Sequence, residues 1–290
     1  MTFNAQKDLI INLKKKANDI RKDILNMVAG AGKGHIATSF SETDILTVLY
    51  FHVLKVDSHN PKWNKRDRFI LSKGHGCEAL YVILSNLGYF EKDLLKTYLK
   101  FNTRLAAHPN MNKLPGIEAT TGSLGHGLSI SVGIALNGKM EGANYRIFTM
   151  LGDGEIDEGQ VWEAAMCAAH YKLDNLIGII DRNNLQNDGR TEDIMNSEPL
   201  REKWESFGWA VREIDGHAIE QIINVFKLIP FTKGKPSMII AKTTKGKGSS
   251  YIENRYDKHY IAITEEEANM IMKDLNKIEE ALSSEKNIKY

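Results

Sequence analysis

Apolar residues follow two different periods along this chain. Near the N-terminus they recur every three or four positions, at Leu9, Leu13, Ala17, Ile20 and Ile24. This spacing predicts an amphipathic helix, which the glycine-rich stretch 30–34 would end. Further along, short unbroken apolar runs alternate with helical patterns, and such runs are typical of strands buried on both faces of a parallel sheet.

The predicted elements alternate between strand and helix over most of the chain. The predicted strands are 67–72, 145–151, 175–181, 209–214 and 236–241. The predicted helices are 42–53, 78–87, 92–100, 125–140, 161–171, 217–228 and 265–282, with a long loop at 102–122. Alternation of this kind favours an α/β fold, a mostly parallel sheet with helices on both faces. We expect residues 1–290 to form a single domain with a C-terminal helix at about 265–282.

Composition and charge mainly exclude classes of function. The 290 residues are 42% hydrophobic, enough to bury a sizeable core. Lys and Arg number 38 against 37 Asp and Glu, so the net charge indicates neither a nucleic-acid nor a membrane partner. Cys77 and Cys167 have no metal-type spacing, which favours a reducing compartment. With no signal-peptide pattern and no long apolar run, we expect a cytoplasmic protein.

Two polar motifs follow neighbouring predicted strands. Asp153 lies in Gly152-Asp153-Gly154, and Asn183 follows the next strand, 30 positions later (183 − 153). That separation accommodates one helix and one return strand, so both side chains should meet at the same sheet edge, where such folds bind ligands. Carboxylate and amide oxygens suit Mg²⁺. Gly154 would let a diphosphate approach the backbone of the following helix.

This arrangement resembles the diphosphate-binding motif of thiamine-diphosphate enzymes, and other motifs resemble those of transketolases. They occur in the family's order over about residues 8 to 262. The motifs are Lys33-Gly34-His35, Leu71-Ser72-Lys73-Gly74-His75, Ala107-His108-Pro109, Thr120-Thr121-Gly122-Ser123-Leu124-Gly125, Gly152-Asp153-Gly154 with Glu158-Gly159, and Lys242-Thr243 with Lys245-Gly246.

The resemblance implies a set of site residues. For the metal, Mg²⁺ with Ca²⁺ or Mn²⁺ as substitutes, it implies Asp153, Asn183 and the backbone carbonyl of Leu185. For thiamine diphosphate it implies His75, Gly122, Ser123, Leu124, Gly154, Glu158, Lys245 and His259. For catalysis it implies His35 and His259 in proton transfer and oxyanion stabilisation, with His108 orienting the donor sugar. Imidazole, with a pKa near 6.5, suits proton transfer at neutral pH.

The other histidines lack this support. A lone histidine is more often a hydrogen-bonded structural residue than a catalytic one. We therefore interpret His52, His59, His170 and His217 as structural or surface residues, although Asp215-Gly216-His217 resembles a turn of the family.

The resemblance covers the diphosphate-binding half of a transketolase. In the family, the other half carries the glutamate that activates the cofactor's pyrimidine and most groups that bind the substrate phosphate. We therefore expect the N-terminal subunit of a split transketolase. With a C-terminal partner, as a heterotetramer, it would move a two-carbon ketol unit between sugar phosphates such as those of the pentose phosphate pathway.

Some residues depart from the family pattern. Cys77 and Glu78 stand where small residues and proline are usual, and Tyr260 follows His259 where glycine is usual. Glu78 could alter substrate preference, but we favour a helix cap. The donor and acceptor sugars therefore stay open, and a ketol transferase of a specialised sugar or natural-product pathway is the alternative.

The presence of Asp153, Asn183 and the four loop histidines argues against a non-catalytic homologue. An α subunit of a 2-oxo acid dehydrogenase fits the motifs Lys33–His35 and Ser72–His75 less well, and a deoxyxylulose phosphate synthase is ordinarily one longer chain.

Overall fold

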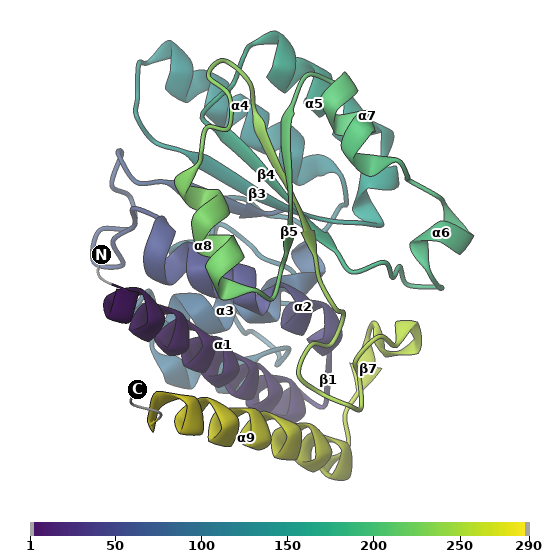
Figure 1. The fold of residues 1–290 in the computed structure, drawn as a ribbon. Helices are drawn as coiled ribbons and strands as arrows, with labels where there is room; N and C mark the ends of the chain where they lie inside the picture. Colours follow the sequence, from purple (N-terminus) through teal and green to yellow (C-terminus); the bar gives the residue numbers. More distant parts are fainter. Residues whose placement is uncertain (1–2, 288–290) are drawn as a thin grey trace.

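The computed structural model describes residues 3–287, and a five-stranded sheet lies at the centre of the fold (Figure 1). Its strands are β2 (Arg68–Leu71), β3 (Ile147–Gly152), β4 (Leu176–Arg182), β5 (Ala210–Asp215) and β6 (Ser237–Lys242). They follow the order β2-β3-β4-β6-β5, and every neighbouring pair is parallel. The predicted α/β fold with a parallel sheet is confirmed, and each predicted strand lies within two residues of an observed one.

Helices cover both faces of the sheet (Figure 1). Two hydrophobic clusters lie between the sheet and these helices, one on each face. The helices of one face are α1 (Phe3–Ala31), α2 (Ile36–Val48), α3 (Cys77–Asn86) and α8 (Ile219–Lys227), and those of the other are α4 (His126–Met140), α5 (Gly159–His170) and α7 (Leu200–Ser206). Successive strand residues alternate between the clusters, with Phe148 and Met150 in the first and Ile147 and Leu151 in the second. The unbroken apolar strands are thus buried on both sides.

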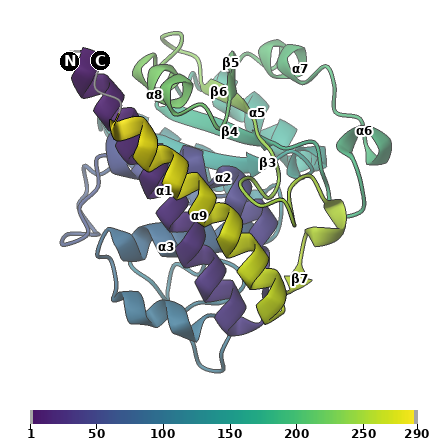
Figure 2. The same cartoon turned by 60° about the horizontal axis from the view of Figure 1, so that its bottom comes forward.

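The C-terminal helix α9 (Glu265–Asn287) lies antiparallel to α1 (Figure 2). The Asn18 amide donates to the Leu275 carbonyl at 2.9 Å, and Lys22 pairs with Glu279 at 2.5 Å. The helix begins where the sequence predicts and continues to Asn287. None of the helices within residues 3–287 combines the length and hydrophobicity needed to span a bilayer.

Two predicted helices differ from the structure. Helix α2 begins at Ile36, not at residue 42, and it passes into a π-helical turn over Leu49–Val53. All its residues are buried, the polar ones included, so it has no solvent-exposed face and no amphipathic period to reveal its start. The predicted helix 92–100 is a 3₁₀ segment at Lys92–Thr97, and Leu99, which adopts φ of 58°, prevents a helix from continuing to residue 100.

Several short elements have no counterpart in the prediction. These are α6 (Thr191–Ile194), α7, and the antiparallel pair of β1 (Lys33–Gly34) and β7 (Ile261–Ala262). In this pair Gly34 lies opposite Ile261. The pairing of β1 with β7 therefore brings the segment that carries His35 beside the segment that carries His259, although the two segments are far apart in sequence.

Helix α4 is the small-residue helix that the sequence predicts, and its glycines do permit close packing. A Cβ added to Gly138 would lie 2.6 Å from Cε2 of Tyr145, a buried ring. A Cβ on Gly133 of the same helix would meet nothing within 4 Å.

We predict opposite effects for two alanine substitutions in α4. Gly138→Ala should lower the free energy of unfolding by about 1–3 kcal/mol, because the new methyl group overlaps the Tyr145 ring. Gly133→Ala, the matched control, should raise it by about 0.5–1 kcal/mol, since alanine favours the helix more than glycine does. Urea denaturation followed by far-UV circular dichroism measures both, and equal effects would contradict the packing argument.

Candidate thiamine diphosphate site

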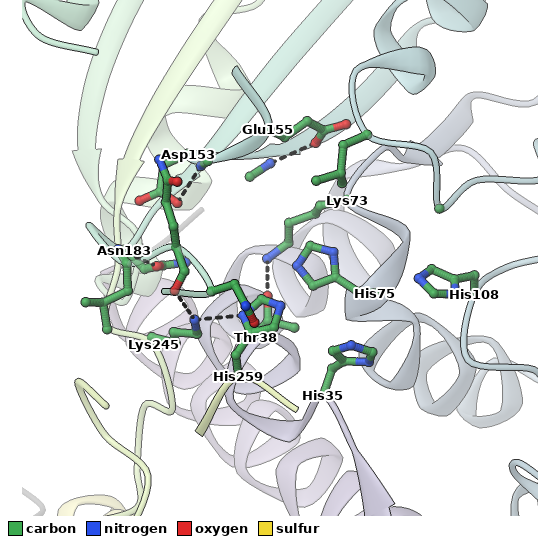
Figure 3. Close-up of a pocket in the computed structure, with 17 residues that line it drawn as sticks. His35, Thr38, Lys73, His75, His108, Asp153, Glu155, Asn183, Lys245 and His259 are labelled. Atoms are coloured by element: carbon green, nitrogen blue, oxygen red, sulfur yellow. Dashed lines mark hydrogen bonds between the residues drawn. The ribbon is translucent and has the colours of Figure 1, made fainter. Parts of the chain in front are cut away.

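A cavity of about 360 Å³ lies at the carboxyl ends of the central strands (Figure 3). The predicted residues that line it are His35, His75, His108, Gly122, Leu124, Asp153, Gly154, Asn183, Leu185, Lys245 and His259. Lys73, Asp153, Asn183 and Lys245 come from segments that follow β2, β3, β4 and β6. The strand order therefore collects residues from most of the chain at one edge of the sheet.

Ser123 and Glu158 are the predicted cofactor-binding residues that the structure leaves outside this lining. Both side chains are exposed. Thr38, Lys73, Glu155, Gln186 and Asn187 also line the cavity, although their positions in the sequence predict no role for them. Lys73 lies inside the motif Leu71–His75, and a lysine at the end of an apolar strand could have signalled its role.

The predicted metal ligands lie together on one side of the cavity (Figure 3). Asp153 is 2% exposed, and its carboxylate accepts from the backbone N–H of Asn184 at 2.6 Å and from Arg182 at 3.2 Å. The Asn183 amide oxygen accepts from the N–H of Leu185 at 3.1 Å. One carboxylate, one amide and one backbone carbonyl form a set of hard oxygen donors that could hold Mg²⁺.

The ammonium of Lys73 is buried beneath the cavity. It pairs with Glu42 at 2.9 Å and with Asp181, and it donates to the Thr38 hydroxyl at 3.0 Å. Burial raises the pKa of Glu42 to about 8 even though Lys73 opposes the shift, so Glu42 holds a proton at neutral pH. Lys73 and Asp181 then form a charged pair that fixes the ends of β2 and β4 to each other.

Glu155 joins three of the family motifs through one buried carboxylate. It accepts hydrogen bonds from the Ser72 hydroxyl, from the N–H of Gly125 at 2.8 Å and from the N–H of Gly152 at 3.0 Å. These donors belong to the loop after β2, to the start of α4 and to the end of β3. Glu155 therefore fixes these three segments relative to one another on one side of the cavity.

Lys245 presents a second buried cation to the cavity. Its side chain is 1% exposed, and its ammonium lies 2.9 Å from Nδ1 of His259 and 3.3 Å from the carbonyl of Gln186. Burial lowers its pKa to about 8, although Asp153 opposes the shift. Lysine ammonium groups are common partners of phosphate oxygens, so Lys245 could hold a diphosphate beside the metal ligands.

Four histidines gather on the side of the cavity away from Asp153 (Figure 3). The centroid of the His35 ring lies 5.5 Å from that of His75, 5.6 Å from His259 and 6.1 Å from His108. Burial, with repulsion from His108 and Lys245, lowers the pKa of His35 to about 4. Burial and Lys245 lower that of His259 to about 3, and burial also lowers the pKa values of His75 and His108. The four rings are therefore uncharged at neutral pH.

The carboxylate of Glu78 binds the backbone N–H of His35. Glu78 lies in the first turn of α3, but its buried carboxylate accepts from the N–H of His35, the Ser39 hydroxyl and the Tyr98 hydroxyl, each at 2.7 Å. Our preferred interpretation, a helix cap, therefore misses its main contacts. Glu78 connects α3 to the segment that carries a predicted catalytic histidine.

His108 is placed by close contact between two loops. The hydroxyl of Tyr81 donates to the His108 carbonyl at 3.0 Å. Gly122 has φ of 141°, and a Cβ there would lie 2.9 Å from Cδ2 of His108. Only glycine combines this backbone conformation with so close an approach, which explains the glycine in the motif Thr120–Gly125.

Comparison with known proteins identifies the domain. The family described as transketolase, thiamine diphosphate binding domain, matches residues 13–281. The chain is 46% identical over 256 residues to the 6-deoxy-6-sulfo-D-fructose transketolase subunit SqwG of Clostridium sp. (strain MSTE9), covering 88% of this chain and 93% of that protein. It is 43% identical over 275 residues to an apulose-4-phosphate transketolase subunit of Phocaeicola vulgatus, covering 95% of this chain and 98% of that protein.

Solved structures agree with this result. The transketolase of Campylobacter jejuni superposes with a TM-score of 0.83 at 30% identity, covering 93% of this chain and 46% of that one. The chain thus spans about half the length of the solved transketolases it matches. The fold and motifs define a thiamine-diphosphate-binding domain. The chain belongs to the transketolase family and corresponds to its N-terminal half.

The neutral histidines predict a loss of stability in acid. In the unfolded chain a histidine protonates near pH 6.5, whereas in the fold the pKa of His35 is about 4. Acid therefore favours the unfolded state, and stability falls as the pH drops from 6.5 towards 4. At pH 5 the His35 contribution is about 2 kcal/mol. His35→Gln should reduce the loss of unfolding free energy between pH 7 and pH 5 by about that amount.

Urea titrations of the purified chain at the two pH values measure this difference. His59→Gln, a substitution at an exposed histidine, is the matched control and should leave the loss unchanged. If His35→Gln loses as much stability as the unmodified chain, His35 is not held neutral by its surroundings.

Proposed function

We propose that this chain is the cofactor-binding subunit of a two-chain transketolase that uses thiamine diphosphate and Mg²⁺. Together with a C-terminal chain, as a heterotetramer in the cytoplasm, it transfers a two-carbon ketol unit from a ketose to an aldose. The observation that carries the proposal is that one cavity collects oxygen donors for a metal, buried ammonium groups and four neutral histidines. Thiamine diphosphate, when bound, supplies the carbanion chemistry of the reaction.

The charges of the cavity suit a metal-bound diphosphate. Asp153 and Asn183 offer oxygen ligands, and Lys245 offers an ammonium beside them. Burial and the neighbouring Asp181 raise the pKa of Asp153 to about 6, so a divalent cation would offset the cost of keeping it charged. We infer that Leu185 adds its backbone carbonyl and that Gly154 leaves room for the diphosphate.

The histidines suit the proton transfers that ketol transfer requires. His35 is neutral, so it can accept a proton from a sugar hydroxyl and return it later. The Lys245 ammonium donates to Nδ1 of the neutral His259 ring, so Nε2–H of that ring can donate to a developing oxyanion. The same ring can accept a proton once Lys245 turns to a bound anion. An anion bound beside Lys245 would weaken the repulsion that lowers the pKa of His259, and would so make that ring a better base. We assign His108, near the edge of the cluster, to binding the donor sugar.

The relatives support the need for a second chain. The two bacterial relatives are named as subunits, and this chain aligns with 93% and 98% of their lengths. The human transketolase, by contrast, is 35% identical over 264 residues that make up 42% of that protein. We infer that a separate chain supplies the pyrimidine-binding half.

A transferase for a specialised sugar is a second candidate, and Tyr260 favours it. The Tyr260 ring packs against His35 with centroids 4.6 Å apart and stays 45% exposed. It adds an aromatic ring beside a predicted catalytic histidine, at a position where the family usually has glycine. The two bacterial relatives are named for 6-deoxy-6-sulfo-D-fructose and apulose 4-phosphate, which are unusual sugars.

Reconstitution with the partner chain tests the proposed function. The two chains, with thiamine diphosphate and Mg²⁺, should show ketol transfer that neither chain shows alone. Xylulose 5-phosphate with ribose 5-phosphate should be compared with 6-deoxy-6-sulfo-D-fructose and apulose 4-phosphate as substrates. Turnover with an unusual sugar and none with the pentose phosphates would decide for the second candidate. Binding of the cofactor without turnover of any sugar would contradict both.

We predict that Asp153→Ala removes Mg²⁺-dependent binding of thiamine diphosphate. The substitution deletes the charged oxygen ligand, so the affinity for thiamine diphosphate should fall by more than about a hundredfold. Loss of a residue that only hydrogen-bonds to a metal ligand usually costs less than this. Calorimetric titration of the two-chain complex measures the affinity. Asp193→Ala, which removes an exposed carboxylate of α6, is the control and should bind normally. Unchanged affinity in Asp153→Ala would refute the metal assignment.

Tyr260→Gly should change sugar selection and leave cofactor binding intact. The ring contacts His35 and lies outside the cavity lining, so its removal opens space on the sugar side. We expect KM for the preferred sugar to rise about tenfold, with the cofactor affinity within about twofold of the original. Tyr260→Phe keeps the ring and serves as the control. An unchanged KM across all sugars would exclude a role in specificity.

A further inference from the structure

The turn Asp215-Gly216-His217, which follows β5, lies outside the cofactor cavity. His217 is largely buried and lines a second cavity of about 580 Å³ together with Asp44 and Arg21. Its place in the sequence predicts only a structural or surface residue. Its two ring nitrogens nevertheless connect α2 to the loop that carries Lys245, and this connection gives it a role in the site.

The hydrogen bonds of His217 define its tautomer. The backbone N–H of Thr244 lies 2.8 Å from Nε2, and a backbone N–H can only donate. Nε2 must therefore be the unprotonated acceptor, and Nδ1 carries the proton. Nδ1 lies 2.7 Å from the carboxylate of Asp44, to which it donates. His217 is thus a neutral ring that links a carboxylate to a backbone amide.

Asp44 is a firm anchor for this ring. Its two oxygens accept from the Arg21 guanidinium at 3.1 and 2.7 Å, and Arg21 also donates to the carbonyl of Phe40 at 3.0 Å. Burial alone would raise the pKa of Asp44, but Arg21 and His217 hold it below its usual value. A charged carboxylate, held by two helices, therefore fixes the orientation of His217.

The amide that His217 holds belongs to the neighbour of Lys245. On the other side, the N–H of Gly246 donates to the carbonyl of Ala37 at 2.8 Å, and Asn254 donates to the carbonyl of Lys245 at 2.9 Å. The backbone around Lys245 is thus held on both sides, while its ammonium reaches His259 at 2.9 Å. The turn fits closely against this loop, since a Cβ on Gly216 would lie 2.4 Å from Cγ2 of Thr243.

We propose that His217 is a positioning residue, which Asp44 and Arg21 orient and which fixes the Thr244 amide so that Lys245 points into the cofactor cavity. It is not among the residues that line the cofactor cavity, and it acts through the backbone of the loop. The inference rests on the proposed function in one respect, namely that Lys245 binds the diphosphate.

Two substitutions at His217 test its two hydrogen bonds separately, the one with Asp44 and the one with the Thr244 amide. In His217→Gln the side-chain oxygen can reach the place of Nε2, so the variant keeps an acceptor for Thr244. In His217→Asn the shorter amide can replace Nδ1–H towards Asp44 but cannot reach Thr244. Each variant therefore keeps one partner, and the pair differs in the bond that the proposal requires.

The first measurement needs no cofactor. Hydrogen exchange of the Thr244 amide in the full chain should be at least about tenfold faster in His217→Asn than in the unmodified chain, the effect of losing one buried hydrogen bond. In His217→Gln it should stay within about threefold of the original. Equal exchange in both variants would overturn the proposal.

The second measurement is the affinity of the two-chain complex for thiamine diphosphate with Mg²⁺. His217→Asn should raise Kd about tenfold and His217→Gln about twofold or less. In a Lys245→Met background the effect of His217→Asn should disappear, because the group that it positions is absent. A lower melting temperature in His217→Asn, with unchanged Kd and unchanged Thr244 exchange, would show a structural role only and would overturn the proposal.

The positioning role of His217 can be tested even if the proposed function is wrong. If the unmodified complex binds no thiamine diphosphate, the proposed function fails, and Thr244 exchange still decides whether His217 holds the loop. If His217→Asn does not fold, Asp44→Asn tests the same path, since loss of the anchoring charge should also accelerate Thr244 exchange. Protection equal to that of the unmodified chain would then contradict the inference.

Discussion

The buried ammonium of Lys73 is the constraint on which the cofactor site depends. Taking an ammonium out of water costs several kcal/mol unless it is paired and hydrogen-bonded, and Lys73 meets that cost through Asp181, Glu42 and Thr38. These partners come from the end of β4 and from the central helix α2, so the charge can be accommodated only when both are in place. Loss of the Asp181 carboxylate would leave the Lys73 charge unbalanced beneath the cavity, and loss of Glu42 would remove one of its acceptors.

Two other buried carboxylates, like the partners of Lys73, join separate segments of the chain around the cavity. Glu155 accepts from three loops, and Glu78 accepts from the backbone of His35 and from two hydroxyl groups. Both are almost fully buried, and burial raises their pKa values. Polar groups of this kind stabilise little by themselves, but they specify one arrangement, because each has satisfied partners only in that arrangement. These buried carboxylates, and not contacts among the loops alone, therefore fix the positions of the side chains in the site.

The sequence predicts the sheet well because unbroken apolar runs have few other interpretations in a chain of this kind. It also predicts Asp153, Asn183 and the four histidines that line the cavity, because their motifs are local. It fails where the signal is not local. Helix α2 is buried all round and shows no period, while the contacts of Glu78 and His217 lead to residues far away in sequence. Those pairings arise only when the strands are ordered in space.

The pairing of β1 with β7 also has a consequence for the order of assembly. It joins Gly34 to Ile261, so one wall of the cavity is made from segments near opposite ends of the described chain. During synthesis the sheet strands and most helices emerge before residue 259, yet the histidine cluster must wait for that last segment. Closing so long a loop comes late, after the local contacts have formed. A nascent chain can therefore bury most of its core before the wall of the cavity that carries His259 has formed.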